Sequence, residues 1–196
     1  MGIQTNGSHV HWNYLIALDQ DLAKVSRFIE FSEANFNTYS IELAHLLLAA
    51  SSEVDVVLKA LCNLKNPAAD HKNIDQYRKT IREKLPNLIT EKCFIYRYCL
   101  ELEPWSNWQG EENPIWWRSY NKVKHQRDEH FSEANLKNAL NAVSALSLVV
   151  LYYYREVFSQ ESQEAPLNFR DVTQKLKPEP DLIEFSGEYV HHNLLI

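Results

Sequence analysis

"IELAHLLLAASSEVDVVLKALCNL", residues 41–64, is the stretch on which the fold depends. It contains neither glycine nor proline, the two residues that most often interrupt a helix. Thr38 and Ser40, just before it, are of the kind that caps a helix start. The sequence therefore predicts one long helix from residue 41 to about residue 64.

Four further helices are expected around this one, from apolar residues at helical spacing and from helix-start and helix-stop residues. Their predicted ranges are 15–31, 74–85, 114–127 and 132–158. The first carries its apolar residues at a 3-4-3-3 spacing, at Leu15, Leu18, Leu22, Val25 and Phe28. Pro86 stops the second, Asn113 and Pro114 suit the start of the third, and Ser132 suits the start of the fourth. The inner side of the fourth is expected to hold Leu136, Leu140, Val143 and Val150.

One segment changes period. In "CFIYRYCLEL", residues 93–102, apolar and aromatic residues alternate as in a half-buried strand. A single strand leaves backbone groups unpaired, so a partner is required, and "LIEFSGEYV" at residues 182–190 is one candidate. We therefore expect a mainly α fold: a helical bundle over residues 1–158, with a small strand-containing insertion around 90–112. Residues 159–196 are polar and contain proline, which predicts an extended tail that can pack back on the bundle.

Composition narrows the class of protein. A chain with 45% hydrophobic residues and only four glycines is typical of a globular, helix-rich protein. The net charge of −6 argues against a general nucleic-acid coating protein. The N-terminal residues show no signal-peptide pattern, and the apolar run 142–154 is too short for a membrane span, so a soluble cytoplasmic protein with no membrane association is expected.

Metal and cofactor chemistry find little support in the sequence. Three cysteines at these spacings predict neither a disulfide framework nor a structural zinc site. Two histidine pairs, His9 with His11 and His191 with His192, lack an accompanying cluster of carboxylates or thiolates at ligand spacing. We therefore expect no metal and no cofactor.

The segment "WWRSYNKVKHQR", residues 116–127, concentrates positive charge in an acidic chain. On a helix, one side would hold the anchoring residues Trp116, Tyr120 and Val123. The opposite side would hold a polar row, made of Arg118, Asn121, Lys122 and His125. Arg118 and His125 are seven residues apart, so they lie nearly in line, two turns or roughly 10 Å along the axis.

This segment resembles the HEPN family, whose motif is an arginine and a histidine separated by four to six residues on a late helix of an α-bundle. The match here is "RSYNKVKH", residues 118–125, with six intervening residues. The resemblance covers roughly residues 15–158. It implies a compact bundle that often dimerises, and in many members a metal-independent endoribonuclease of toxin or antiphage systems, with an antitoxin or another partner protein.

Metal-free RNA cleavage needs acid–base groups and a cation at one phosphate. The hypothesis assigns acid–base catalysis to His125, the phosphate clamp to Arg118 and an orienting role to Asn121. Lys122, Lys124 and Arg127 would hold flanking phosphates.

The mechanism needs two proton transfers, but each chain would supply only one histidine to the site. A homodimer would supply a second. Glu42, Asp55 and Lys59 on the long helix would orient His125 or shape the cleft if their stripe faces it.

Two other functions stay open. A catalytically silent HEPN-like module would bind a nucleotide, an RNA or a protein partner through the same face. A helical interaction protein would carry the charged row as ordinary solvated surface, with Arg118 paired to Glu111 or Glu112. Trp105 and Trp108, in the loop before the motif, are candidates for stacking on bases. The geometric test is whether Arg118 and His125 are exposed in a shared cleft.

Overall fold

The computed structural model describes residues 7–162, 167–187 and 189. This part of the chain is mainly helical, with seven α-helices, short 3-10 turns and one two-stranded sheet. The helices are α1 (Val10–Val25), α2 (Ile41–Lys65), α3 (Ile74–Lys84), α4 (Ile115–His125), α5 (Arg127–His130), α6 (Leu136–Ser162) and α7 (Phe169–Lys175). The strands are β1 (Cys93–Ile95) and β2 (Leu100–Leu102).

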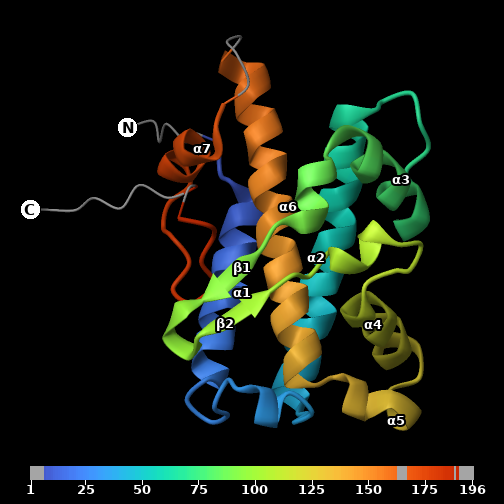
Figure 1. Ribbon diagram of the computed structural model, residues 1–196, viewed down its shortest axis with the longest axis vertical. Coiled ribbons are helices and arrows are strands. Elements are labelled where there is room, and N and C mark those ends of the chain that lie inside the picture. Colours follow the sequence, from blue (N-terminus) through green and yellow to red (C-terminus); the bar gives the residue numbers. More distant parts are fainter. Residues whose placement is uncertain (1–6, 163–166, 188, 190–196) are drawn as a thin grey trace, which may run out of the picture.

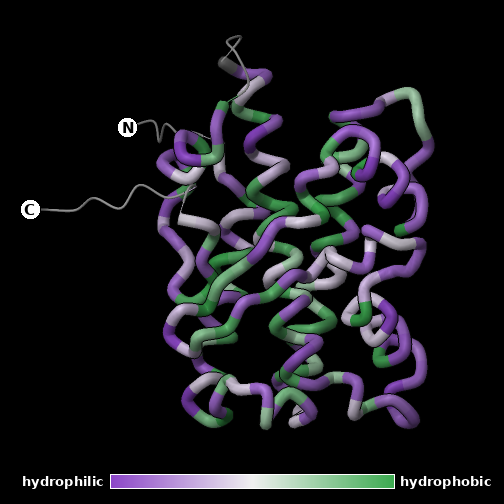
Figure 2. Tube along the Cα trace, viewed as in Figure 1, coloured by the Kyte–Doolittle hydropathy of each residue, from purple (hydrophilic) through white to green (hydrophobic). Residues whose placement is uncertain are grey.

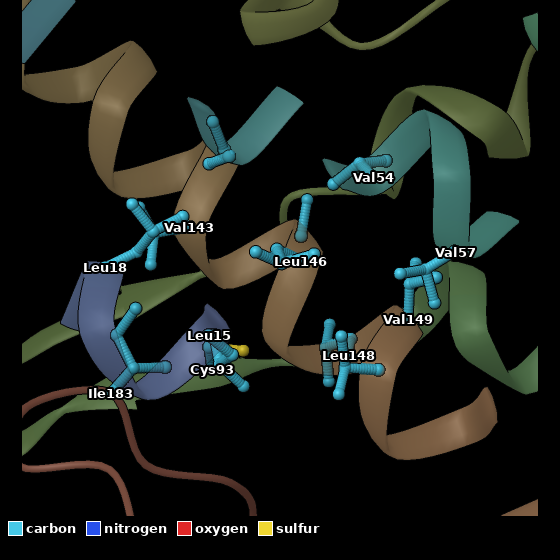
Figure 3. Packing of buried hydrophobic residues seen from close by; sticks show 14 of the residues in the cluster. Leu15, Leu18, Val54, Val57, Cys93, Val143, Leu146, Leu148, Val149 and Ile183 are labelled. Atoms are coloured by element: carbon cyan, nitrogen blue, oxygen red, sulfur yellow. The ribbon is translucent and has the colours of Figure 1, made fainter. Parts of the chain in front are cut away.

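Helix α6 is the centre of the core. It packs along α2 over most of its length and also contacts α1, α4 and α7 (Figure 1). Figure 3 shows Leu146 and Val149 of α6 among side chains of α1 and α2. Every residue from 142 to 152 is buried. Protein therefore surrounds this part of α6, which explains why its sequence is apolar on all sides. The four residues predicted to face inward, Leu136, Leu140, Val143 and Val150, are all 0% exposed.

The length and composition of α6 also bear on a membrane location. Among the described residues, the segment Leu136–Glu161 is the one helix long and apolar enough to cross a membrane. However, 83% of its most apolar window is buried inside the protein. That is the pattern of a core helix, as the sequence predicted for the apolar run 142–154.

Capping residues predict the start of α2 correctly but not that of α6. The Ser40 hydroxyl accepts a hydrogen bond from the Leu43 backbone N–H (3.2 Å), so α2 begins at the predicted position. Helix α6 begins at Leu136 rather than Ser132, because residues 131–133 form a 3-10 turn and the Asn135 side chain makes the cap.

Helix α1 departs from the prediction at both ends. It begins at Val10 and ends at Val25. Four of the residues expected on its apolar side are buried, namely Leu15, Leu18, Leu22 and Val25. Phe28 lies beyond the end of the helix and is 85% exposed. The prediction that Phe28 faces the core is therefore wrong.

The segment 93–102 is a hairpin and not the single strand that its alternation predicted. Strands β1 and β2 pair antiparallel, with Cys93 opposite Leu102. The chain reverses through a 3-10 turn at Tyr96–Tyr98 and through Cys99, which has a left-handed backbone (φ 52°). The expected partnership with the C-terminal segment is present as one bridge, in which Phe94 and Glu184 exchange two backbone hydrogen bonds of 2.8 Å.

The described part of the tail packs back on the helices. It contains α7, and its buried residues include Leu176, Leu182, Ile183 and Phe185. The buried Asp19 carboxylate of α1 accepts hydrogen bonds from the backbone N–H groups of residues 181, 182 and 183, at 2.6, 3.1 and 2.9 Å. The prediction that this tail is extended is therefore wrong for residues 167–187, whereas packing against the bundle is confirmed there.

Hydropathy separates the interior from the periphery. Hydrophobic residues concentrate in the central helices and the hairpin, whereas α3, α4 and α5 are mostly hydrophilic (Figure 2). The polar row of the motif therefore lies on an outer helix, supported from one side by α2 and α6.

Candidate functional site

Helix α4 begins one residue later than predicted. Pro114 occupies the capping position and the first helical residue is Ile115. The Asn113 side chain does not cap the helix. It donates to the Asp75 carboxylate of α3 (3.2 Å) and lies 3.4 Å from the Arg78 guanidinium, so it ties the loop before α4 to α3.

The loop before α4 is held by one arginine of α3. The Arg82 guanidinium donates to the backbone carbonyls of Trp108 (2.8 Å), Gln109 (3.1 Å) and Gly110 (2.5 Å). It also contacts the Glu111 carboxylate at 2.6 Å. A planar guanidinium can satisfy several acceptors at once, which fixes the path of the loop into α4.

The loop tryptophans are not available for base stacking. Trp105 and Trp108 are both 0% exposed, and their ring centroids lie 4.4 Å apart. Trp105 also packs edge-to-face against Trp116 of α4. The prediction that Trp105 and Trp108 stack on bases is therefore wrong, because both belong to the core.

The inner face of α4 is anchored as predicted. Trp116, Tyr120 and Val123 are 2%, 6% and 0% exposed, and Trp116 Nε1 donates to the Pro104 carbonyl at 2.8 Å. Because these residues fix the rotation of α4, its polar side points away from the core.

Arg118 and Lys122 lie on that outer side, and each has an acidic neighbour. Arg118 Nη2 is 3.4 Å from Glu112 Oε2, in an exposed pair. This is one of the two pairings that the surface interpretation predicted. Lys122 Nζ is 2.7 Å from Glu133 Oε1. The pKa of Glu133 is lowered mainly by the hydrogen bond from Lys122 and, to a smaller extent, by the hydrogen bond from Ser119.

His125 is the last residue of α4 and is exposed. It makes no hydrogen bond or ion pair with any described residue. The side chain of Asn121 donates to the Trp117 carbonyl (2.9 Å), so in this structure it does not orient His125. Lys124 Nζ lies 3.2 Å from the Tyr120 hydroxyl.

Arg127 is not on the motif helix. The backbone leaves helical geometry at Gln126 (φ −143°, ψ 52°), and Arg127 begins the short helix α5. The prediction of one helix through residue 127 is therefore wrong. Arg127 instead lines a cavity of about 510 Å³ beside the start of α2.

The three residues proposed to support His125 from α2 do not gather around it. Glu42 is exposed, 3.9 Å from His45 Nδ1, and lines a cavity between α1 and α2. Asp55 neighbours Tyr77 of α3, and burial together with this carboxylate raises the pKa of Tyr77. Lys59 is exposed. No hydrogen bond or ion pair links the three to α4 within the described ranges.

The histidine pairs do not form a metal centre in the described residues. His11 Nδ1 contacts Glu53 Oε1 at 2.5 Å, and His9 packs edge-on against Tyr154. No cluster of three or more potential ligands occurs in the part of the chain that the structure describes. His191 and His192 lie outside that part.

Sequence reasoning missed the acidic partner Glu133 and the cavity at Arg127. Glu112 could be considered because it is six residues from Arg118, whereas Glu133 reaches Lys122 only through the turn after α4. Another cavity, of about 580 Å³, lies between β2 and the starts of α4 and α6. Neither this cavity nor the one at Arg127 is lined by Arg118 or His125. The geometric test is therefore met in part: both residues are exposed on one helix face, but they do not share either of these cavities.

Together these features define a mainly helical protein that presents an arginine, a lysine and a histidine in a row on an outer helix. No protein-family model, no curated protein and no solved structure matches the chain. Its function is therefore inferred from α4 and the groups around it.

Proposed function

We propose that this chain is a HEPN-like, metal-independent endoribonuclease whose site is the Arg118–His125 row of α4. The observation that carries the proposal is that both side chains are exposed on the same face of one helix, two turns apart. The opposite face of that helix is buried by aromatic anchors, so the row is held in a fixed orientation.

The chemistry suits these residue types. A base removes the proton of the ribose 2′-hydroxyl, and the 2′-oxygen attacks phosphorus. The bond from phosphorus to the 5′-oxygen then breaks, and an acid protonates that oxygen, which leaves a 2′,3′-cyclic phosphate. Histidine titrates near neutral pH and suits both proton transfers. Arg118 would stabilise the extra negative charge on the phosphate in the transition state.

The ion pair between Arg118 and Glu112 is compatible with phosphate binding. Their side chains are 51% and 70% exposed. An exposed pair of this kind contributes only about 0–1 kcal/mol, so a phosphate can replace Glu112 at the guanidinium.

A second copy of the chain would complete the site. One His125 serves one proton transfer at a time, and a symmetric dimer that brings two α4 helices together would place a second His125 at the same phosphate. The cleft between the helices would be positive although the whole chain is acidic. A role as a toxin or phage-defence component in the cytoplasm, with an antitoxin partner, belongs to the same proposal and is supported by the resemblance to HEPN proteins.

A second function has its own support. Both Arg118 and Lys122 already have carboxylate partners. This favours a helical interaction protein in which the charged row of α4 is ordinary solvated surface, since Glu112 is one of the two partners expected for Arg118 in that case.

The test is RNA cleavage in EDTA by the wild-type protein beside Arg118→Ala and His125→Ala. Arg27→Ala is the control, because Arg27 is an exposed arginine in the turn after α1. We expect cleavage with a cyclic phosphate end by the wild type and the control, and loss of cleavage in both α4 variants. Cleavage that survives His125→Ala would rule out the proposed site. RNA that is bound but left intact by the wild type would favour the silent module.

A further inference from the structure

A cavity lies at the end of α4 that carries His125. It has a volume of about 510 Å³ and lies between the start of α2 and the turn formed by α5 and residues 131–133. Its lining residues are Ile41, Ala44, His45, Arg127, Asp128 and Phe131, and we call it the α2–α5 cavity. Because Arg127 follows His125 by two residues, the cavity adjoins the proposed site.

The position of this cavity is fixed by backbone contacts between its two sides. The Leu136 N–H donates to the Thr38 carbonyl at 2.9 Å, and the Lys137 N–H donates to the Phe36 carbonyl at 3.2 Å. Tyr39 and Asn135 form an antiparallel bridge. The start of α2 and the start of α6 are therefore held together, and the turn between α4 and α6 forms the other side of the open cavity.

The walls of the cavity offer apolar surface to solvent. Ile41 is 64% exposed, and Phe131 packs edge-on against Tyr39, which is itself 51% exposed. Exposed apolar and aromatic side chains beside a cavity are suited to contact with the face of a nucleobase.

The polar groups of the cavity include one free cation and one free carboxylate. Neither Arg127 nor Asp128 forms an ion pair with any residue in the described ranges. A carboxylate has two acceptor oxygens and matches two adjacent N–H donors. Guanine presents such a pair on its Watson–Crick edge, whereas adenine and cytosine place an acceptor beside a donor, and uracil has a single donor between two acceptors.

We propose that the α2–α5 cavity binds a guanine base of the RNA, with Asp128 accepting from its two N–H groups and Arg127 donating to its carbonyl or to the adjoining phosphate. This inference rests on the proposed function, because it takes RNA as the ligand of α4. The larger cavity beside β2 suits RNA less well, since its charged lining residues are Glu33, Glu101, Glu103 and Lys137.

The test uses calorimetric titration of the full-length protein with GMP, AMP, CMP and UMP at low salt. We expect GMP to bind about tenfold more tightly than AMP, the effect that one directional base contact typically has. Asp128→Asn should abolish that preference. Glu129→Gln is the matched control, since Glu129 is an exposed neighbour on α5 that does not line the cavity and should leave the preference unchanged.

A second measurement needs no variant. In the wild-type protein, GMP should shift the amide NMR resonances of Ala44, His45 and Phe131. Equal affinity for all four nucleotides, a preference that survives Asp128→Asn, or shifts confined to other parts of the molecule would each overturn the inference.

The outcome also separates this inference from the proposed function. A preference for guanine without RNA cleavage would support the cavity as a nucleotide-binding site and would contradict the proposed nuclease activity. Cleavage that depends on His125, with no preference for guanine, would support the nuclease activity and would contradict the proposed guanine-binding site.

Discussion

The acidic partners of the basic residues on α4 decide which of these residues are free to bind a ligand. Glu133 is the most important counter-charge, because its carboxylate accepts hydrogen bonds from Lys122 and from the buried Ser119, both at 2.7 Å. These contacts hold the turn after α4 against the helix. They also occupy the lysine that lies between Arg118 and His125.

Glu133→Gln should therefore have a pH-dependent effect on stability. The pKa of Glu133 is lowered in the folded protein, so its ionised form stabilises the fold above its ordinary value of 4.5, and this contribution is lost as pH falls through the lowered pKa. We expect the variant to lose roughly 0.5–1 kcal/mol at neutral pH, the upper range for a partly exposed pair. The difference from the wild type should shrink under acid conditions, measured by urea unfolding.

The control for this prediction is Glu129→Gln, which removes the same charge from an exposed position nearby. It should change the free energy of unfolding little at either pH. If the cost of Glu133→Gln were the same in acid as at neutral pH, the role of Glu133 would lie in packing or neutral hydrogen bonding and not in its charge.

At the scale of elements, the position of α4 depends on the loop that precedes it. Arg82 of α3 supplies hydrogen bonds to three consecutive backbone carbonyls and to the Glu111 carboxylate. The same loop carries Glu112, the partner of Arg118. One arginine thus connects α3 to the arrangement of the proposed site.

Arg82→Lys should loosen this loop. A lysine ammonium has three donors on a flexible stem and cannot reach the four acceptors that the guanidinium contacts. We expect a loss of about 1–2 kcal/mol in unfolding free energy, in the range for lost hydrogen bonds to a charged group. Hydrogen–deuterium exchange at residues 108–113 should become faster. Lys79→Gln, an exposed change on the same helix, should leave that exchange unaltered; equal exchange in Arg82→Lys and the wild type would contradict the prediction.

The elements also show what could be predicted from sequence. Helix α2 was predictable because its cap at Ser40 and its uninterrupted apolar spacing are local signals. The hairpin was not, because its reversal at residues 96–99 contains no glycine, proline or asparagine, and Cys99 adopts the left-handed conformation instead. The break after His125 was also missed, and it moved Arg127 away from the motif helix.

For the whole molecule, the prediction failed where distant segments meet. The sequence of the tail is mostly polar and contains proline. Its few apolar residues are buried only because α1 and β1, which are distant in the sequence, lie beside them. Trp12 Nε1 donates to the Pro178 carbonyl at 2.8 Å, and Asp19 holds residues 181–183. The candidate site also shows that only local features could be predicted. Helical periodicity was enough to predict that Arg118 and His125 are exposed. The burial of the loop tryptophans could not be predicted, because it depends on tertiary packing.

A chain that ends at Glu161 should therefore be less stable than the full chain. It lacks α7 and the buried Leu176, Leu182, Ile183 and Phe185, and it exposes the apolar surface of α1 and β1 that they cover. Each of these side chains stabilises by about 1.5–3 kcal/mol on burial, and the entropy of ordering the tail offsets much of the sum. We expect a net loss of roughly 2–4 kcal/mol, measured by urea unfolding, together with greater aggregation.

Two comparisons make this prediction specific. Gln174→Ala, an exposed change on α7, keeps the tail and should match the wild type within about 0.5 kcal/mol. Asp19→Asn keeps the tail but turns an amide N–H₂ group toward backbone N–H donors, which leaves buried donors unpaired and should cost roughly 2 kcal/mol. If the chain ending at Glu161 unfolded at the same urea concentration as the full chain, residues 167–187 would not belong to the cooperative core, and the hydrogen bonds at Asp19 would contribute nothing to holding the two ends of the protein together.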